Sequence, residues 1–181
     1  MHIIPNTLVA KLTQSLKSST LQQRTLWIAQ IVDEEIDIKE LCDLFLCQDR
    51  TTALRFSWFL SEIGMYKSTA LLAVLPYLFE CRKQTSIKDF TYSFVKYWRI
   101  AGVPQETKGD AINLLFDWLI DRATSVSVKT HAMEVLFGLT KEFPDLKNEL
   151  ITCIEDQVDK TKVSFGIKAK EILSKLKRIE N

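Results

Sequence analysis

The stretch that decides the fold is ALRFSWFLSEIG, residues 53–64. Its large apolar side chains lie three and four positions apart, at Phe56, Phe59, Leu60 and Ile63. This spacing places them on one face of an α-helix. One helix cannot bury so wide an apolar face by itself, so the segment predicts a helix that packs among neighbouring helices.

The composition favours helices and provides no strong overall charge. The 181 residues include only five Gly and four Pro, whereas β proteins and low-complexity segments need more of these turn formers. Lysine and arginine number 24 against 23 acidic residues, so the net charge of +1 gives no overall field that would attract nucleic acid or another anionic partner. The 46% of apolar residues is ordinary for a globular chain of one domain.

Segments with the helical period follow one another along the chain. Thr20 and Gln23 have the form of a capping box and predict a helix over residues 20–35. Side chains that accept hydrogen bonds from free amides mark further helix starts at Asp49, Ser68, Ser86 with Asp89, Ser125 or Ser127, and Ser164. No segment alternates convincingly with period two. We expect about ten helices joined by short loops, as between antiparallel neighbours.

Five of these segments recur at a regular interval. The strings that align are TLWIA at Thr25, FSWFL at Phe56, FVKYW at Phe94, AMEVL at Ala132 and AKEIL at Ala169. They are separated by 31, 38, 38 and 37 residues. An interval near this value accommodates two helices of about 12–15 residues and two turns. The sequence therefore predicts stacked helical pairs, in which Trp58 or Leu54 contacts the next repeat.

Three strings resemble HEAT and armadillo-like helical repeats: RFSWFLSEI, THAMEVLFGLTKEFPDLKNELITCIED and GIKAKEILSKL. The resemblance covers residues 20–178 and implies an all-α fold, a right-handed α-α superhelix of about four to five helical pairs. The first unit departs from the family pattern, because its interval is short, its second helix near IKELCDLFLC is abbreviated and the Asp and Arg ladder is incomplete. We expect one repeat domain over residues 1–181, with capping helices at 1–19 and 163–181.

A polar stripe on one predicted helix is the candidate binding site. Asn113, Asp117 and Asp121 are four residues apart, with Trp118 and Arg122 beside them. Carboxylates beside an aromatic side chain in a HEAT-like fold resemble the alkylpurine DNA glycosylases, in which an Asp assists base excision and aromatic side chains hold the damaged base. The other interpretation, which we favour, is a solvated helix face with Trp118 in the core.

Two basic groups are further candidates for a surface that binds phosphates. The first is Arg82, Lys83, Lys88, Lys96, Arg99 and Lys108, interleaved with Tyr92, Tyr97 and Trp98. The second is Lys168, Lys170, Lys175, Lys177 and Arg178, beside Ile172, Leu173 and Leu176. Aromatic side chains near cations are typical of nucleic-acid binding, but cations also gather at helix C-termini and on solvated helix faces. We favour that second interpretation for the first group, and for the second group we favour an amphipathic capping helix over contact with a membrane or nucleic acid.

No motif for catalysis, a metal or a cofactor is present in the sequence. The scattered cysteines lack a C-x-x-C spacing and are expected to be buried thiols: Cys42, Cys47, Cys81 and Cys153. Only two histidines occur, and the five glycines are isolated, with Gly138 expected at a close helix crossing. The first residues lack the pattern of a signal peptide, and the longest apolar run, residues 70–79, is too short to cross a bilayer. We therefore expect a cytoplasmic protein.

The sequence favours a non-catalytic adaptor or scaffold that binds a protein or peptide. The expected contact surface is the concave groove lined by the second helix of each pair, near residues 67–83, 108–122 and 145–159. The alternative is a nucleic-acid-binding protein related to the alkylpurine glycosylases. The oligomeric state is left open, and function inferred from a fold is an association only.

Overall fold

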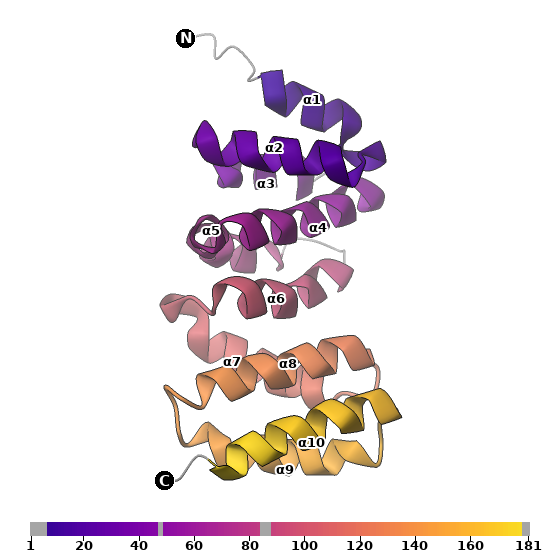
Figure 1. Ribbon diagram of the computed structural model, residues 1–181, viewed down its shortest axis with the longest axis vertical. Helices are drawn as coiled ribbons and strands as arrows, with labels where there is room; N and C mark the ends of the chain where they lie inside the picture. Colours follow the sequence, from indigo (N-terminus) through magenta and orange to yellow (C-terminus); the bar gives the residue numbers. More distant parts are fainter. Residues whose placement is uncertain (1–6, 47–48, 84–87, 179–181) are drawn as a thin grey trace. The chain divides into compact units, whose positions relative to one another are not determined.

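The computed structural model describes residues 7–46, 49–83 and 88–178 (Figure 1). Every regular element within these ranges is helical, with ten α-helices and two short 3-10 helices in succession. The all-α prediction and the expected number of helices are confirmed. The chain forms two compact units, Met1–Pro104 and Gln105–Asn181, called unit 1 and unit 2. That they belong to one repeat domain stays a prediction.

Unit 1 is a two-layer arrangement of helices around α4. Its elements are α1 Thr7–Ser15, η1 Leu16–Ser18, α2 Leu21–Asp33, α3 Ile38–Leu46, α4 Arg50–Tyr66, α5 Ser68–Cys81 and α6 Lys88–Ala101. Figure 1 shows α2, α4 and α6 in one layer, with α3 and α5 behind them. Helix α4 packs against α2, α3, α5 and α6. Its apolar face is therefore covered by neighbours, as the 53–64 stretch predicts.

Helix caps in unit 1 follow the sequence signals at two of the predicted starts. Thr20 and Gln23 form the complete capping box of α2, and the Asp49 carboxylate accepts hydrogen bonds from the first amides of α4. Helix α5 begins at Ser68, as predicted, but the expected side-chain cap is absent, because Ser68 is the first helical residue and Lys67 precedes it without a side-chain hydrogen bond. The start predicted from Ser86 and Asp89 lies outside the described side chains.

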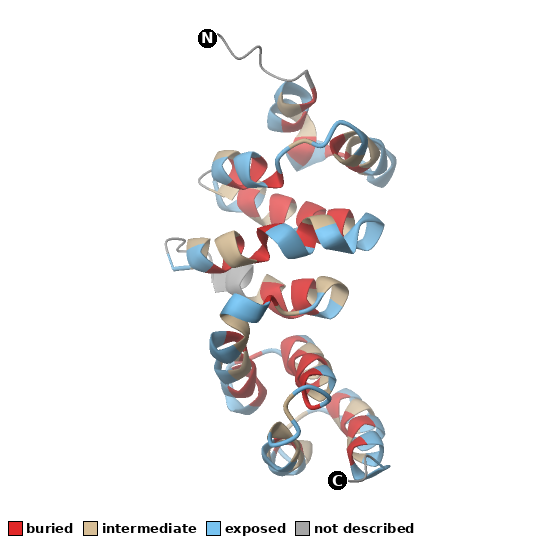
Figure 2. Ribbon diagram, turned by 90° about the vertical axis from the view of Figure 1, so that its left-hand side faces the viewer, coloured by how far each residue is buried: buried red, intermediate tan, exposed pale blue. Residues whose placement is uncertain are grey.

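Stacked aromatic rings form the core of unit 1. The rings of Phe45 and Phe56 stack with centroids 5.0 Å apart, and Phe79 meets Phe94 edge to face at 5.5 Å. Tyr97 on α6 is fully buried, and its hydroxyl donates a hydrogen bond of 2.9 Å to a backbone carbonyl of α4. Figure 2 shows buried residues where helices face one another. Aromatic packing and a buried hydroxyl together fix how α6 lies on α4.

Two residues of α4 correct the predicted packing of the helix. Trp58 is 54% exposed, whereas Leu54, the other residue predicted to contact the next repeat, is half-buried, so that contact stays a prediction for Leu54 alone. The close helix contact lies instead at Gly64, where an added Cβ would come within 2.3 Å of the Leu71 side chain and 3.2 Å of Ile100. A residue without a side chain is thus required where α4, α5 and α6 meet.

Unit 2 repeats the same two-layer plan with four helices. Its elements are η2 Gln105–Thr107, α7 Lys108–Ile120, α8 Val126–Leu139, α9 Leu146–Val158 and α10 Val163–Arg178. Figure 1 shows α8 and α10 in one layer and α7 and α9 in the other. Helix α10 buries an apolar face against α8 and α9, composed of Phe165, Ala169, Ile172 and Leu176. Its role as a capping helix stays a prediction.

Three predictions for unit 2 can be compared with its local structure. The Ser125 side chain accepts a hydrogen bond from the Val128 amide and caps α8, as predicted. Ser164 lies inside α10, which begins at Val163, so its assignment as a cap is wrong. No atom lies within 4 Å of a Cβ built on Gly138, so the expected close helix crossing at this glycine is wrong as well.

The five strings that align in the sequence lie on alternate helices: α2, α4, α6, α8 and α10. Within each unit, most helices pack against both the next helix and the next but one. Stacked helical pairs produce this pattern of neighbours. The first string is out of register, because Thr25 is exposed while Ile28 and Ile31 are buried. The superhelical path itself stays a prediction.

Candidate functional site

The polar stripe predicted on α7 is exposed, but its aromatic neighbour is not. Asn113, Asp117, Asp121 and Arg122 are all exposed to solvent. Trp118 is only 6% exposed and belongs to the core of unit 2. The indole ring therefore offers no open face on which a base or another aromatic group could stack.

Asp121 closes the turn that follows α7. Its carboxylate accepts hydrogen bonds from the Ala123 amide at 3.1 Å and from the Thr124 hydroxyl at 2.9 Å. These hydrogen bonds hold the pKa of Asp121 below its ordinary value, because they stabilise the charged form. Since both carboxylate oxygens are engaged within the turn, Asp121 shapes the end of α7 and fixes the direction in which the chain enters α8.

Arg122, the last residue of the predicted stripe, borders a cavity of about 430 Å³. The cavity lies within unit 2, where the α7–α8 and α9–α10 turns meet. Four of its lining residues are cationic and two carry hydroxyls: Arg122, Lys129, Lys160 and Lys162, with Thr124 and Thr161. Sequence reasoning found only Arg122. Thr124 lies in the same turn, whereas the other four come from α8 and from the α9–α10 turn. We call this set the cation cavity.

Lys129 is the buried member of the cation cavity. Its residue is only 4% exposed, and its Nζ donates a hydrogen bond of 2.7 Å to Oε1 of Gln157. Gln157 is buried too, and its Nε2 donates to an Asp156 carboxylate oxygen at 2.9 Å. Burial lowers the pKa of Lys129, although the carboxylates of Asp121 and Asp156 oppose this shift. The ammonium group thus forms its hydrogen bond with a neutral amide. The carboxylates of Asp121 and Asp156 act on it from beyond hydrogen-bond distance.

The first predicted basic group does not form a surface with stacking residues. Tyr97 and Trp98 are buried in unit 1, so neither is available for the stacking that the less favoured nucleic-acid interpretation requires. The Lys83 ammonium pairs with Glu80 at 2.7 Å, and the Arg82 guanidinium lies over the Phe79 ring. Lys88 lies outside the described side chains. The cations whose contacts are described here are thus engaged with their own helix.

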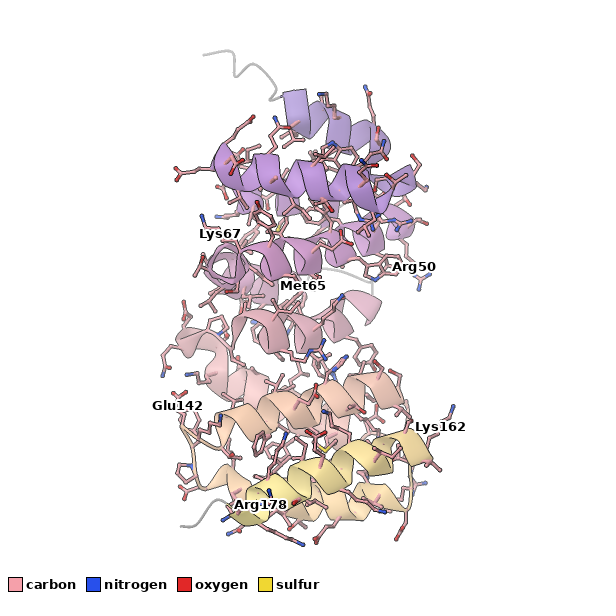
Figure 3. All side chains as sticks on the ribbon, in the orientation of Figure 1. Arg50, Met65, Lys67, Glu142, Lys162 and Arg178 are labelled. Carbon is pink, nitrogen blue, oxygen red and sulfur yellow. The ribbon has the colours of Figure 1, made fainter. Side chains whose placement is uncertain are left out.

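Interface-type side chains form an exposed row on α4 that the sequence analysis missed. Trp58, Met65 and Tyr66 are 54%, 68% and 57% exposed, and the Arg55 guanidinium lies 5.3 Å from the centre of the Trp58 ring. Figure 3 shows Met65 on the layer formed by α2, α4 and α6. We call these four residues the α4 row. Arg55, Met65 and Tyr66 are three, seven and eight positions from Trp58, which is a helical spacing, but the sequence analysis assigned Trp58 to a contact with the next repeat.

Other reactive or metal-binding side chains are few in the part of the chain that the structure describes. Cys42 is buried, which raises the pKa of its thiol. Cys81 and Cys153 are half-buried, so the prediction of complete burial is wrong for both, and Cys47 lies outside the described residues. Within residues 7–46, 49–83 and 88–178, no cluster of His, Cys, Asp and Glu suits a metal ion, and no helix combines the length and apolarity that spanning a bilayer requires.

Comparison with known proteins does not extend this description. No protein-family model, no curated protein and no solved structure matches the chain. The resemblance to HEAT and armadillo-like repeats consequently remains an expectation drawn from the sequence pattern, and the function has to be inferred from the geometry of the described residues.

Proposed function

We propose that the protein is a non-catalytic intracellular adaptor or scaffold that binds a protein or peptide partner. The α4 row is the observation that carries this proposal. Tryptophan, tyrosine, methionine and arginine are the residues enriched at protein interfaces, and tryptophan, tyrosine and arginine dominate binding energies there. Here one side chain of each type lies on a single exposed face of one helix.

The helix under the α4 row is held rigidly, which favours recognition. Glu62 lies within the same helical face, and its carboxylate forms an ion pair of 2.7 Å with Arg24 of α2. Gly64 brings the opposite side of α4 into close contact with α5 and α6. Because the scaffold does not have to be ordered on binding, less conformational entropy is lost when a partner associates.

The predicted concave groove offers a second surface in unit 1, between α3 and α5. A cleft of about 340 Å³ lies there, lined by Lys39, Ala70, Ala73 and Tyr77 among others. The Lys39 ammonium lies 4.7 Å from the centre of the Tyr77 ring. The cleft belongs to the expected groove helix, residues 67–83, whereas the α4 row does not. Variants can therefore separate the two surfaces.

The test is affinity capture with the full chain, followed by quantitative mass spectrometry of the captured proteins. The double variant Trp58→Ala with Met65→Ala is compared with Val163→Ala with Ile167→Ala, which also removes two exposed apolar side chains. We expect the first pair to lose at least about 90% of the captured partner, because removing a tryptophan hot spot commonly weakens binding by more than tenfold. Equal capture by both pairs would contradict the proposal.

A third variant decides between the two surfaces. Ala73→Glu places a charge in the α3–α5 cleft, on an exposed position of α5. If the α4 row binds the partner, this variant captures it normally. Loss of the partner in Ala73→Glu, with normal capture by the α4-row variant, would locate binding in the predicted groove instead.

The nucleic-acid alternative has its own test. We expect short duplex DNA to bind weakly at low salt and not measurably at physiological salt, because the net charge of +1 gives little counterion release. We also expect Asp117→Asn, on the exposed face of α7, to leave partner binding and stability nearly unchanged. Tight DNA binding with a steep salt dependence, or loss of a base-excision activity in Asp117→Asn, would overturn the adaptor proposal.

A further inference from the structure

The cation cavity is formed at one end of unit 2 by two turns that are distant in sequence. Arg122 and Thr124 come from the α7–α8 turn, and Lys160, Thr161 and Lys162 come from the end of α9 and the turn before α10. Figure 3 shows Lys162 at the end of unit 2 opposite to Glu142. The fold thus places these side chains around one volume of about 430 Å³.

Positive charge exceeds negative charge around this volume. Asp121 is engaged in its turn, and Asp156 pairs with Lys160 at 2.5 Å while accepting the Gln157 amide. Among the described residues, no carboxylate oxygen lies within 4.0 Å of Arg122 or Lys162, although the charge of Arg122 contributes to lowering the pKa of Asp156. Four cations therefore face two acidic groups. Asp156 already pairs with one of the four, Lys160, and Asp121 is engaged within its turn, so three cations have no carboxylate in direct contact among the described residues.

Lys129 makes the cavity more than a cluster of surface cations. A buried ammonium group normally requires a negative partner, because removing it from water is costly. Among the described residues, no carboxylate oxygen lies within 4.0 Å of this ammonium, and its hydrogen bond goes to the neutral Gln157. Two further N–H donors of the ammonium group remain for an acceptor in the cavity.

The chemistry of the lining selects the class of anion. A guanidinium group binds phosphate oxygens through two parallel hydrogen bonds, and lysine ammonium groups bind them as point charges. The cavity lies where the N-terminal ends of α8 and α10 meet the C-terminal ends of α7 and α9, so the helix dipoles oppose one another and the cationic side chains provide the selection. From this excess of cations around a buried ammonium, we infer that the cation cavity binds a phosphate monoester dianion.

An adjoining cavity provides room for the organic part of the phosphate ester. It has a volume of about 660 Å³ and shares Thr124, Val126 and Lys162 with the cation cavity. Hydroxyl groups dominate its remaining lining, with Ser125, Ser127, Thr130 and Ser164. A small phosphate ester and a phosphorylated side chain of a protein present the same dianion, and both have a polar body that this surface can accept.

The test is isothermal titration calorimetry of the full chain with O-phosphoserine and with inorganic phosphate. We expect saturable binding of O-phosphoserine with a dissociation constant of about 0.1–1 mM. Lys129→Met should weaken it about tenfold or more, since a charged hydrogen bond is lost, and Lys162→Gln about threefold. The matched control is Lys170→Gln, an exposed lysine of α10 outside the cavity, which should change the affinity less than about 1.5-fold.

The outcomes separate a specific site from general charge attraction. Circular dichroism establishes that each variant is folded, and Lys162→Gln keeps the test valid if Lys129→Met does not fold. No saturation up to about 10 mM O-phosphoserine, or equal losses in Lys162→Gln and Lys170→Gln, would overturn the inference.

A phosphoserine pentapeptide with alanine flanks, titrated beside its unphosphorylated form, distinguishes the sources of the phosphate. Binding of the phosphopeptide at least about tenfold tighter than O-phosphoserine supports a phosphorylated protein, and equal affinity supports a small phosphate ester. Equal binding of both peptides would contradict a phosphate site. None of these outcomes depends on the α4 row, so the inference and the proposed adaptor function fail separately.

Discussion

Units 1 and 2 share a two-layer helical plan but differ in how their helices are joined. In unit 1, aromatic rings meet across helices, as Phe45 and Phe56 or Phe79 and Phe94 do. In unit 2 the core is mainly aliphatic. Ion pairs between elements occur in both units, as Arg24 with Glu62 at 2.7 Å in unit 1, and in unit 2 Lys108 of α7 with Glu142 of the α8–α9 turn at 2.7 Å and Lys168 of α10 with Glu134 of α8 at 2.7 Å. The same sequence period thus supports two kinds of helix packing.

The two kinds of packing should make the units sensitive to different perturbations. Close-packed rings leave little space for a change of volume, so unit 1 should respond most strongly to changes in side-chain size. Unit 2 carries the buried Lys129 in addition to its ion pairs, so its stability should depend more on pH. The predictions follow from this contrast.

Phe56→Ala should produce the largest loss of stability. Its ring is fully buried between Phe45 and Phe59, and truncation leaves a cavity in the aromatic core of unit 1. We expect the free energy of unfolding to fall by about 3–5 kcal/mol. Urea denaturation followed by circular dichroism measures this loss, and hydrogen exchange should show that amides of α4 and α6 lose protection. A loss below about 1 kcal/mol would mean that these rings do not form a tightly packed core.

Gly64→Ala and Gly138→Ala should change stability in opposite directions. The added methyl group at Gly64 collides with Leu71, so we expect a loss of about 1–3 kcal/mol in unit 1. At Gly138 the space is open within α8, and alanine should stabilise that helix by about 0.5–1 kcal/mol. The urea concentration at the midpoint of unfolding, measured for each variant and for the original protein, reports both effects. Shifts of the same sign would contradict the helix contacts around these glycines.

Thr20→Ala tests the capping box of α2 against a helix start that lacks such a cap. Thr20 accepts a hydrogen bond from the Gln23 amide at 3.2 Å, and we expect its loss to reduce the free energy of unfolding by about 0.5–2 kcal/mol. Asp145 precedes α9 without a side-chain cap, so Asp145→Ala should stay within about 0.5 kcal/mol of the original protein. Thermal unfolding of the two variants under identical conditions compares them directly.

Much of the helical plan could be predicted from local signals. The capping box at Thr20 and the acceptor at Asp49 mark the helix starts because a cap is a contact between near neighbours in the sequence. The alternation of pairs could also be predicted, since each helix must bury one apolar face. Predictions that needed distant contacts were less successful. Gly138 and Gly64 are both isolated glycines inside helices, and only the position of Leu71 distinguishes them.

Prediction of the candidate site required even more knowledge of contacts between residues that are distant in the sequence. Arg122 was singled out from a stripe on its own helix, whereas the cation cavity needs residues of the α9–α10 turn, which lie more than 35 positions further along the chain. Lys129 did leave a local signal, because it shares the buried face of α8 with Met133 and Leu136 at helical spacing. A charged residue on an apolar face was therefore the clue, and the sequence analysis did not use it.

The smallest expected effect concerns the buried ammonium of Lys129. Its pKa in the folded protein is lowered by burial, so between that pKa and the ordinary lysine value the unfolded chain binds more protons than the folded one. Stability rises with pH wherever the unfolded chain binds more protons. The unfavourable contribution of Lys129 is thus fully present below its folded pKa and is relieved as the pH rises through it.

Lys129→Met removes this contribution while keeping a side chain of similar length. The hydrogen bond to Gln157 is lost at every pH, so its effect cancels when one protein is compared with itself at two pH values. We expect the original protein to gain stability relative to Lys129→Met between pH 7 and about pH 10, by less than the effect of Thr20→Ala. Urea unfolding of both proteins at the two pH values measures the gain. A difference that is independent of pH would mean that the ammonium is solvated in the folded protein, and the contrast between a volume-sensitive unit 1 and a charge-sensitive unit 2 would then rest on surface ion pairs alone.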